Sequence, residues 1–210
     1  MTVPAFRDIS ILPKVMGIVI GNVRLNQRFL RSKFGIKNTN DNKMTKYFVM
    51  DVDGTLTDGK IYMGQNGEVM KAFNIKDGCG IHDLLIPAGI IPIIITGRKS
   101  DIVINRCNEI GITEVYQGIR DKTEKLREVA QTFSDVAYIG DDINDLACMK
   151  EVKAEGGLIG CPADAVDKVK EISDYTAIRN GGEGAVRDFI EWLLAENDAA
   201  NIAALECGYQ

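Results

Sequence analysis

The amino-acid sequence predicts an α/β protein, built on a Rossmann-like doubly wound parallel sheet with helices on both faces. From residue 46 onward, short continuous apolar runs alternate with helical patterns, as expected when buried parallel strands are joined by crossover helices. Acidic or hydroxyl side chains end three of these runs, where ligands bind in such sheets. A chain of 210 residues is long enough for one well-buried domain of this kind.

The elements follow in order along the chain. The predicted strands are the apolar runs "KYFVMDV" (46–52), "IIPIIITG" (90–97), "DVAYIGDD" (135–142) and the weaker "GGLIGCP" (156–162). The predicted helices lie between or after them, at residues 80–89, 100–111, 122–133 and 143–152. Residues 59–78 break the alternation, because β-type residues flank the turn sequence "GQNGE". This segment predicts a protruding β-hairpin.

Charge and composition divide the chain into three parts. Residues 1–45 carry eight Lys or Arg against two acidic residues, so we expect a basic N-terminal extension outside the catalytic fold. Residues 46–195 form the predicted α/β domain, and residues 196–210 a C-terminal tail. The net charge of the whole chain is −5, and its body is acidic, which disfavours nucleic acid as a partner.

Several other classes are disfavoured by residue content. A single histidine, His82, argues against histidine triads and multi-histidine metal sites. The cysteines are odd in number and form no C-x-x-C pair, which indicates reduced thiols in a cytoplasmic protein. No apolar run reaches the roughly 18 residues of a membrane span, so no membrane partner is expected.

The candidate chemistry stands at the strand ends. Asp51 and Asp53 lie at the end of the first apolar run, and two carboxylates this close repel each other unless a cation or a proton intervenes. Thr96, Lys122 and the acidic "GDDIND" (140–145) follow later in the chain. Each element alone is common in turns and helix caps, but together they suit phosphoryl transfer, which depends on positioning and charge neutralisation. Mg²⁺ prefers carboxylate oxygens and water, as an aspartate-rich site offers.

Spacing disfavours a lid. Neither the interval from Asp53 to Thr96 nor that from Thr96 to Lys122 can hold a folded cap domain, which needs about 50 residues. We therefore expect no cap domain, and a neighbouring subunit as the element that closes the site. A phosphomutase or phosphotransferase is an alternative function from another enzyme class. The absence of a cap argues against it.

The four motifs together resemble those of the haloacid dehalogenase superfamily of phosphatases. The resemblance implies that Asp51 is the nucleophile and that Asp53 is the general acid and then the general base. It implies that Thr96 and Lys122 hold the phosphoryl oxygens. Mg²⁺ would be bound by Asp51, Asp141 and the backbone carbonyl of Asp53. The supporting residues of the last motif would be Asp142, Asn144 and Asp145, with Asp145 orienting Lys122 or a metal-bound water.

Longer segments are similar to the 3-deoxy-D-manno-octulosonate 8-phosphate phosphatase family, among them "DVDGTLTDGKIYMGQNGEVMKAFNIKDGCGI" and "VAYIGDDINDLACM". That resemblance implies a capless homotetramer whose hairpins form a central barrel. It implies that "GGEGAVR" (181–187) approaches an active site, either its own or a neighbour's. The substrate-binding candidates are Thr55, Gly97, Arg98, Asn74, Lys76 and Asp77, although Arg98 and Lys76 could equally be solvated.

The predicted function is a Mg²⁺-dependent phosphatase of a phosphorylated 2-keto-3-deoxy sugar acid, 3-deoxy-D-manno-octulosonate 8-phosphate, acting through an aspartyl-phosphate. Thr55 stands where that branch commonly has valine, and Glu183 leans toward the related nonulosonate (neuraminate-type) 9-phosphate phosphatases of sialic acid metabolism. "KAFNIKDG" leans toward octulosonate. The alternatives are therefore a nonulosonate 9-phosphate phosphatase, or a non-catalytic oligomerisation module related to the domain fused to some cytidylyltransferases.

Overall fold

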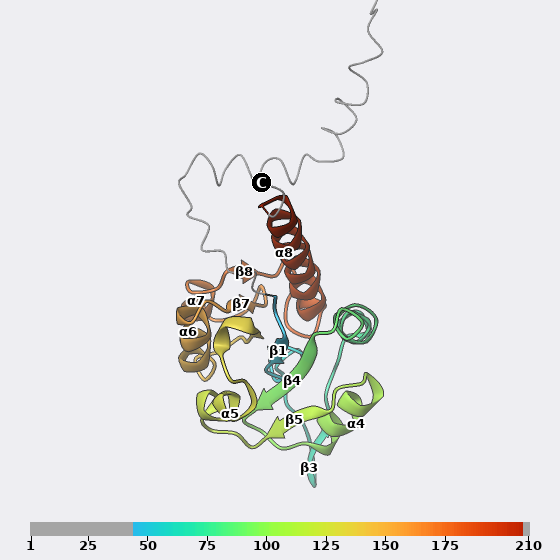
Figure 1. Ribbon diagram of the computed structural model, residues 1–210. Coiled ribbons are helices and arrows are strands. Elements are labelled where there is room, and N and C mark those ends of the chain that lie inside the picture. Colours follow the sequence, from blue (N-terminus) through green and yellow to red (C-terminus); the bar gives the residue numbers. More distant parts are fainter. Residues whose placement is uncertain (1–43, 208–210) are drawn as a thin grey trace, which may run out of the picture. The chain divides into compact units, whose positions relative to one another are not determined.

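A parallel six-stranded sheet forms the centre of the protein, whose computed structural model describes residues 44–207 (Figure 1). The strand order is β5-β4-β1-β6-β7-β8, and every neighbouring pair is parallel. The strands are β1 (Tyr47–Met50), β4 (Ile91–Thr96), β5 (Glu114–Gln117), β6 (Val136–Ile139), β7 (Leu158–Cys161) and β8 (Tyr175–Thr176). The predicted α/β doubly wound fold is confirmed. The predicted N-terminal extension lies outside the described residues, apart from Met44 and Thr45.

Strand β1 lies in the middle of this sheet and sets the register of the site. Met50 is opposite Ile94 of β4 on one side and Ile139 of β6 on the other. Because side chains alternate along a strand, Phe48 and Met50 enter one apolar cluster and Val49 enters a second. Both faces of the sheet are therefore buried, which explains why these strands are continuous apolar runs.

Helices cover both faces of the sheet (Figure 1). On one face, α4 (Asp101–Glu109), the π-helix η2 (Gly80–Leu85) and α8 (Ala185–Cys207) contribute to the first cluster. On the other face, α5 (Lys122–Val129), α6 (Leu146–Ala154) and α7 (Asp167–Lys170) contribute to the second. Phe189 of α8 packs on Phe48 with ring centroids 5.5 Å apart, which fixes α8 against the centre of the sheet.

A separate two-stranded sheet follows the end of β1. It consists of β2 (Tyr62–Gly64) and β3 (Gly67–Met70), which pair antiparallel, so the predicted hairpin is confirmed. Its apolar side chains are mostly exposed in the single chain, including Ile61, Met63 and Val69. Between β1 and β4 the described chain holds this hairpin and short helices, and no folded lid.

Some element boundaries differ from those the sequence suggests. The helix predicted from Gly80 begins earlier, as α3 (Ile75–Cys79), because the Asn74 side chain accepts the Lys76 N–H and caps it. The helix predicted to Phe133 stops at Val129, and Phe133 belongs to the short 3-10 helix η3 (Phe133–Asp135). Strands β5 and β8 were not predicted, and α8 runs across the proposed 195/196 boundary. Among the described residues, no helix has the length and apolar character needed to cross a membrane.

Candidate active site

The loop after β1 carries the two aspartates of the first motif. The strand ends at Met50, and the backbone then folds back, so that Leu56 N and Thr57 N both donate to the Val52 carbonyl at 3.0 Å. Val52 is buried in the core and anchors the turn. Asp51 and Asp53 therefore do not lie on a regular strand, and each carboxylate has its own cationic partner.

Asp51 forms a buried cluster with Lys122 and Asp145. Lys122 Nζ lies 2.9 Å from Asp51 Oδ1 and 2.7 Å from Asp145 Oδ1. The Tyr138 hydroxyl donates to the same Asp145 oxygen at 2.8 Å, and the other oxygen accepts the backbone N–H of Asp141 at 3.2 Å. Asp145 is thus held from several directions and pairs with Lys122 beside Asp51, and its expected role in orienting Lys122 stays a prediction.

Three carboxylates lie close together in this cluster, and two of them, Asp51 and Asp145, pair with the Lys122 ammonium. Oxygens of Asp51, Asp141 and Asp145 lie within 4.8 Å of one another. Burial, reinforced by the Asp145 carboxylate, raises the pKa of Asp51 to about 6, although Lys122 opposes the shift. Burial and then the Asp51 carboxylate raise the pKa of Asp141 to about 7. This excess of negative charge suits a divalent cation, which would restore both groups to their ionised forms.

Gly54 and Thr55 bring the Asp141 carboxylate against the first loop. Gly54 has a φ of 94°, and a Cβ at this position would lie 2.1 Å from Asp141 Oδ2. The Thr55 hydroxyl donates to Asp141 Oδ1 at 3.1 Å. A glycine is therefore required at position 54 by both backbone conformation and space. The buried Thr55 thus contacts a proposed metal ligand, and its predicted contact with substrate stays a prediction.

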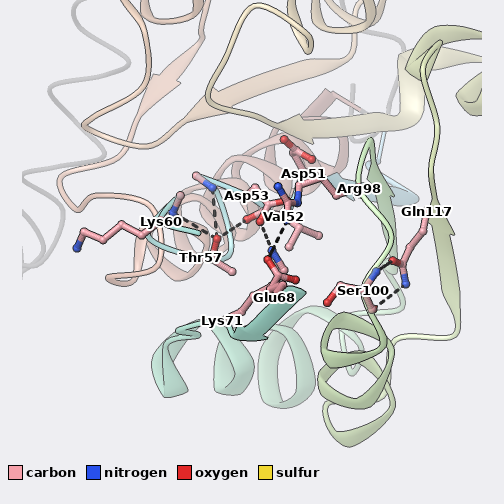
Figure 2. Close-up of polar contacts among 12 residues, drawn as sticks. Asp51, Val52, Asp53, Thr57, Lys60, Glu68, Lys71, Arg98, Ser100 and Gln117 are labelled. Carbon is pink, nitrogen blue, oxygen red and sulfur yellow. Dashed lines mark hydrogen bonds and ion pairs between the residues drawn. The ribbon is translucent and has the colours of Figure 1, made fainter. Parts of the chain in front are cut away.

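Asp53 faces the hairpin (Figure 2). Its carboxylate pairs with the ammonium of Lys71, and Arg98 Nε lies 3.7 Å from its other oxygen. Glu68 of β3 accepts from Lys71 at 3.0 Å and from Arg98 Nη2 at 3.2 Å. Sequence reasoning missed Lys71 and Glu68. The signal was a lysine set between the apolar Met70 and Phe73 in a predicted strand, where a solvated lysine is not expected.

The remaining predicted residues lie around this centre. Thr96 is buried at the end of β4, and Gly97 and Arg98 follow it on the surface. Asp142 and Asn144 are exposed in the turn before α6, and the Asp142 carboxylate accepts the Ile143 N–H at 2.7 Å.

Two residues of "FNIKDG" serve the fold. Asn74 caps α3 and donates from Nδ2 to the Gly182 carbonyl at 3.3 Å. Asp77 is buried and accepts the backbone N–H of Arg187 at 2.8 Å, at the first turn of α8. Lys76 is exposed on α3. The predicted substrate contacts of these three residues stay predictions.

The C-terminal segment before α8 packs on the catalytic loop of its own chain. Gly182 N donates to the Thr55 carbonyl at 3.1 Å, and Gly181 N donates to Asp164 Oδ1 at 2.9 Å. A Cβ on Gly181 would lie 1.8 Å from the Gly54 carbonyl oxygen, so this close approach requires glycine. Residues 181–182 therefore brace the loop after β1 of their own chain.

The fold and the Asp51–Lys122–Asp145 centre, with Asp141 beside it, define the haloacid dehalogenase class of phosphatases, as the motifs predicted. No family model matches the chain. The 3-deoxy-D-manno-octulosonate 8-phosphate phosphatase KdsC of Escherichia coli K12 is 43% identical over 153 residues, covering 71% of this chain and 79% of the relative. The chain belongs to this KdsC family, and the predicted resemblance is confirmed.

Solved structures agree with this assignment. The crystal structure of 3-deoxy-D-manno-octulosonate 8-phosphate phosphatase from Yersinia pestis is 39% identical, with a TM-score of 0.68 over 75% of this chain and 84% of that one. The enzyme from Moraxella catarrhalis, in complex with magnesium ion, phosphate ion and KDO, is 37% identical, with a TM-score of 0.69 over 80% of this chain and 95% of that one.

Proposed function

We propose that this protein is a Mg²⁺-dependent phosphatase that hydrolyses 3-deoxy-D-manno-octulosonate 8-phosphate, as the names of its relatives state for them. The observation that carries the proposal is the buried Asp51–Lys122 pair, with Asp141 alongside and Asp145 behind it. A nucleophilic carboxylate, an ammonium and a second carboxylate for the metal are what phosphoryl transfer to aspartate requires. An enzyme that releases this sugar acid supplies lipopolysaccharide biosynthesis.

The proposed first step is attack by an Asp51 oxygen on phosphorus. The bond from phosphorus to the sugar oxygen breaks, and Asp53 gives its proton to that oxygen. In the second step Asp53 takes a proton from water, which attacks the aspartyl-phosphate and releases phosphate. Asp53 suits this role because it lies two residues beyond Asp51 and its side chain is 22% exposed, so both sugar and water can reach it.

The other residues stabilise charge. Lys122 and Thr96 are proposed to hold the phosphoryl oxygens, and Asp145 positions Lys122. Burial alone would lower the pKa of Lys122, but the Asp51 and Asp145 carboxylates raise it, so the side chain stays an ammonium. Mg²⁺, bound by the Asp51 and Asp141 carboxylates and the Asp53 carbonyl, would neutralise charge between nucleophile and phosphate.

Substrate is proposed to contact residues that surround this centre, as the resemblance implies. Arg98, whose side chain is 42% exposed beside Asp53, is suited to a sugar carboxylate. The other proposed contacts are Thr55, Gly97, Asn74, Lys76 and Asp77. Asp142 and Asn144 are proposed to support the metal side of the site.

We also propose a homotetramer that works in the cytoplasm. The exposed apolar side chains of the hairpin support assembly, because an isolated two-stranded hairpin is marginal in water. Residues 1–45 are proposed to lie outside the catalytic fold, and residues 196–210 to contribute no catalytic side chain.

The decisive experiment is phosphate release from 3-deoxy-D-manno-octulosonate 8-phosphate by the purified full chain. Neuraminate-type 9-phosphates serve as competing substrates, since Glu183 leaves that alternative open. We expect the octulosonate to be preferred, activity to vanish with chelator and return with Mg²⁺, and Ca²⁺ to inhibit because its coordination is larger and looser. Preference for a nonulosonate would transfer the assignment to that branch. Full turnover in metal-free buffer would refute the proposed Mg²⁺-dependent mechanism.

A further inference from the structure

We propose that Lys71 is a positioning residue for Asp53, so that the hairpin takes part in setting the geometry of the acid/base group. The proposal rests on the proposed role of Asp53 in phosphoryl transfer. It concerns a lysine that lies outside the four superfamily motifs.

The observation is a closed ring of alternating charges (Figure 2). Lys71 pairs with Asp53 and, at 3.0 Å, with Glu68. Arg98 closes the ring, 3.2 Å from Glu68 and 3.7 Å from Asp53. The two carboxylates are thus separated by two cations, and each oxygen of Asp53 has a different cation beside it. Such an arrangement fixes the direction of the Asp53 side chain from two sides.

Burial distinguishes Lys71 from an ordinary surface lysine. Its side chain is 1% exposed, whereas that of Lys60, just before the hairpin, is 72% exposed and pairs with Asp58 at 3.3 Å. An ammonium taken out of water is costly unless carboxylates surround it. An apolar residue at position 71 would serve packing alone at less cost, so a role toward Asp53 explains why an ammonium is found there.

The ring also has a mechanical consequence. Glu68 lies in β3 and Lys71 directly follows it, whereas Asp53 lies in the loop after β1. A shift of the hairpin therefore moves Lys71 and Glu68 relative to Asp53, while Arg98 stays just beyond the end of β4 and Asp51 remains paired with Lys122. A misplacement of about 1 Å can cost a reaction about 10²-fold, so hairpin position can control turnover without touching the nucleophile.

The test compares Lys71→Met with Lys60→Met in the full chain with Mg²⁺. Rapid-quench kinetics measure the first phosphoryl transfer from 3-deoxy-D-manno-octulosonate 8-phosphate and from 4-nitrophenyl phosphate. The sugar oxygen is a poor leaving group and needs the Asp53 proton, but 4-nitrophenolate leaves with little acid assistance. For Lys71→Met we expect a loss of about 10- to 100-fold with the sugar phosphate, under threefold with the aryl phosphate, and KM within about twofold. Lys60→Met should match the wild type on both.

Equal losses on both substrates would show a general disturbance of the site and overturn the proposal, as would a Lys71→Met enzyme that behaves like Lys60→Met. If Lys71→Met does not fold, Glu68→Gln breaks the ring while keeping Lys71. This variant should lose several-fold in turnover of the sugar phosphate alone. The absence of this selectivity would refute the proposal. Turnover of the sugar phosphate by the wild type in the same experiment tests the proposed function separately. If the wild type showed no turnover, that result would contradict the proposed function and not the ring.

Discussion

Replacing Asp77 by asparagine should make the protein more stable at neutral pH. Asp77 is 1% exposed, and its carboxylate accepts the Arg187 N–H at the first turn of α8. Its second oxygen, Oδ2, is buried with no hydrogen-bond partner among the described residues. Burial, opposed by backbone hydrogen bonds and assisted by the Asp188 carboxylate, raises the pKa of Asp77 from 3.8 to about 6. Asparagine keeps the accepting oxygen and removes the buried charge.

The size of the effect follows from proton linkage. Because the folded-state pKa is raised, the folded protein binds the Asp77 proton more tightly than the unfolded chain does. The resulting stability is fully present below about pH 4 and is lost as pH rises through about 6. A shift of about two units at 1.36 kcal/mol each corresponds to about 3 kcal/mol. Asparagine has no such dependence, so the variant should gain about that much relative to wild type between pH 4 and pH 7.5.

Urea unfolding of both proteins at these two pH values measures the difference. Asp77→Ala is the matched control, because it removes both the charge and the cap, and should therefore lose about 1 to 2 kcal/mol relative to Asp77→Asn at either pH. A wild-type-to-asparagine difference that stays constant with pH would refute the reasoning. The same variants test the predicted substrate contact, since a raised KM in a stable Asp77→Asn enzyme would support it.

Three further predictions concern the site and the hairpin. Asp51→Asn should keep the fold and lose nearly all turnover in a sample verified as free of deamidation, because an amide is a poor nucleophile; near-normal activity would exclude the assignment. Gly54→Ala should raise the Mg²⁺ concentration needed for half-maximal activity and destabilise by about 1 to 3 kcal/mol, seen by titration and unfolding; wild-type values for both would contradict the proposed contact with Asp141. Replacing Ile61 and Met63 together by charged residues should dissociate the oligomer and lower turnover, as measured by light scattering and a phosphatase assay. A fully active monomer would show that one chain suffices for activity.

Much of the fold could be predicted because buried parallel strands are continuous apolar runs in the sequence. β1 and β4 are apolar on both faces, and Asp51 and Thr96 stand where such strands end. The partners Lys122 and Asp141 could be predicted as well, since parallel topology brings the carboxyl ends of β1 and β6 and the start of α5 to one edge. Strand β5 escaped prediction because its four residues are all half-buried and polar residues flank its Val115 and Tyr116.

Other parts of the site depend on tertiary contacts that no local pattern carries. The pairing of Lys71 with Asp53 requires the hairpin to fold back on the loop after β1, and the sequence gives no distance between them. Asp77 lies in the predicted substrate loop, and no local pattern indicated that its carboxylate also caps a helix more than a hundred residues later in the chain. Such contacts arise from packing between distant elements, and so propensity and periodicity do not report them.

The hydrogen bond from Gly182 N to the Thr55 carbonyl has a consequence for how the protein is made. Asp51 and Asp53 are synthesised early. Residues 181–182, which brace the loop that carries these aspartates, emerge from the ribosome only after the rest of the sheet has emerged. Folding from the N-terminus can therefore build the strands before it can complete the catalytic centre. A nascent chain stalled before residue 181 should hold Asp51 in an unbraced loop, so that phosphatase activity appears only after residues 181–182 have emerged.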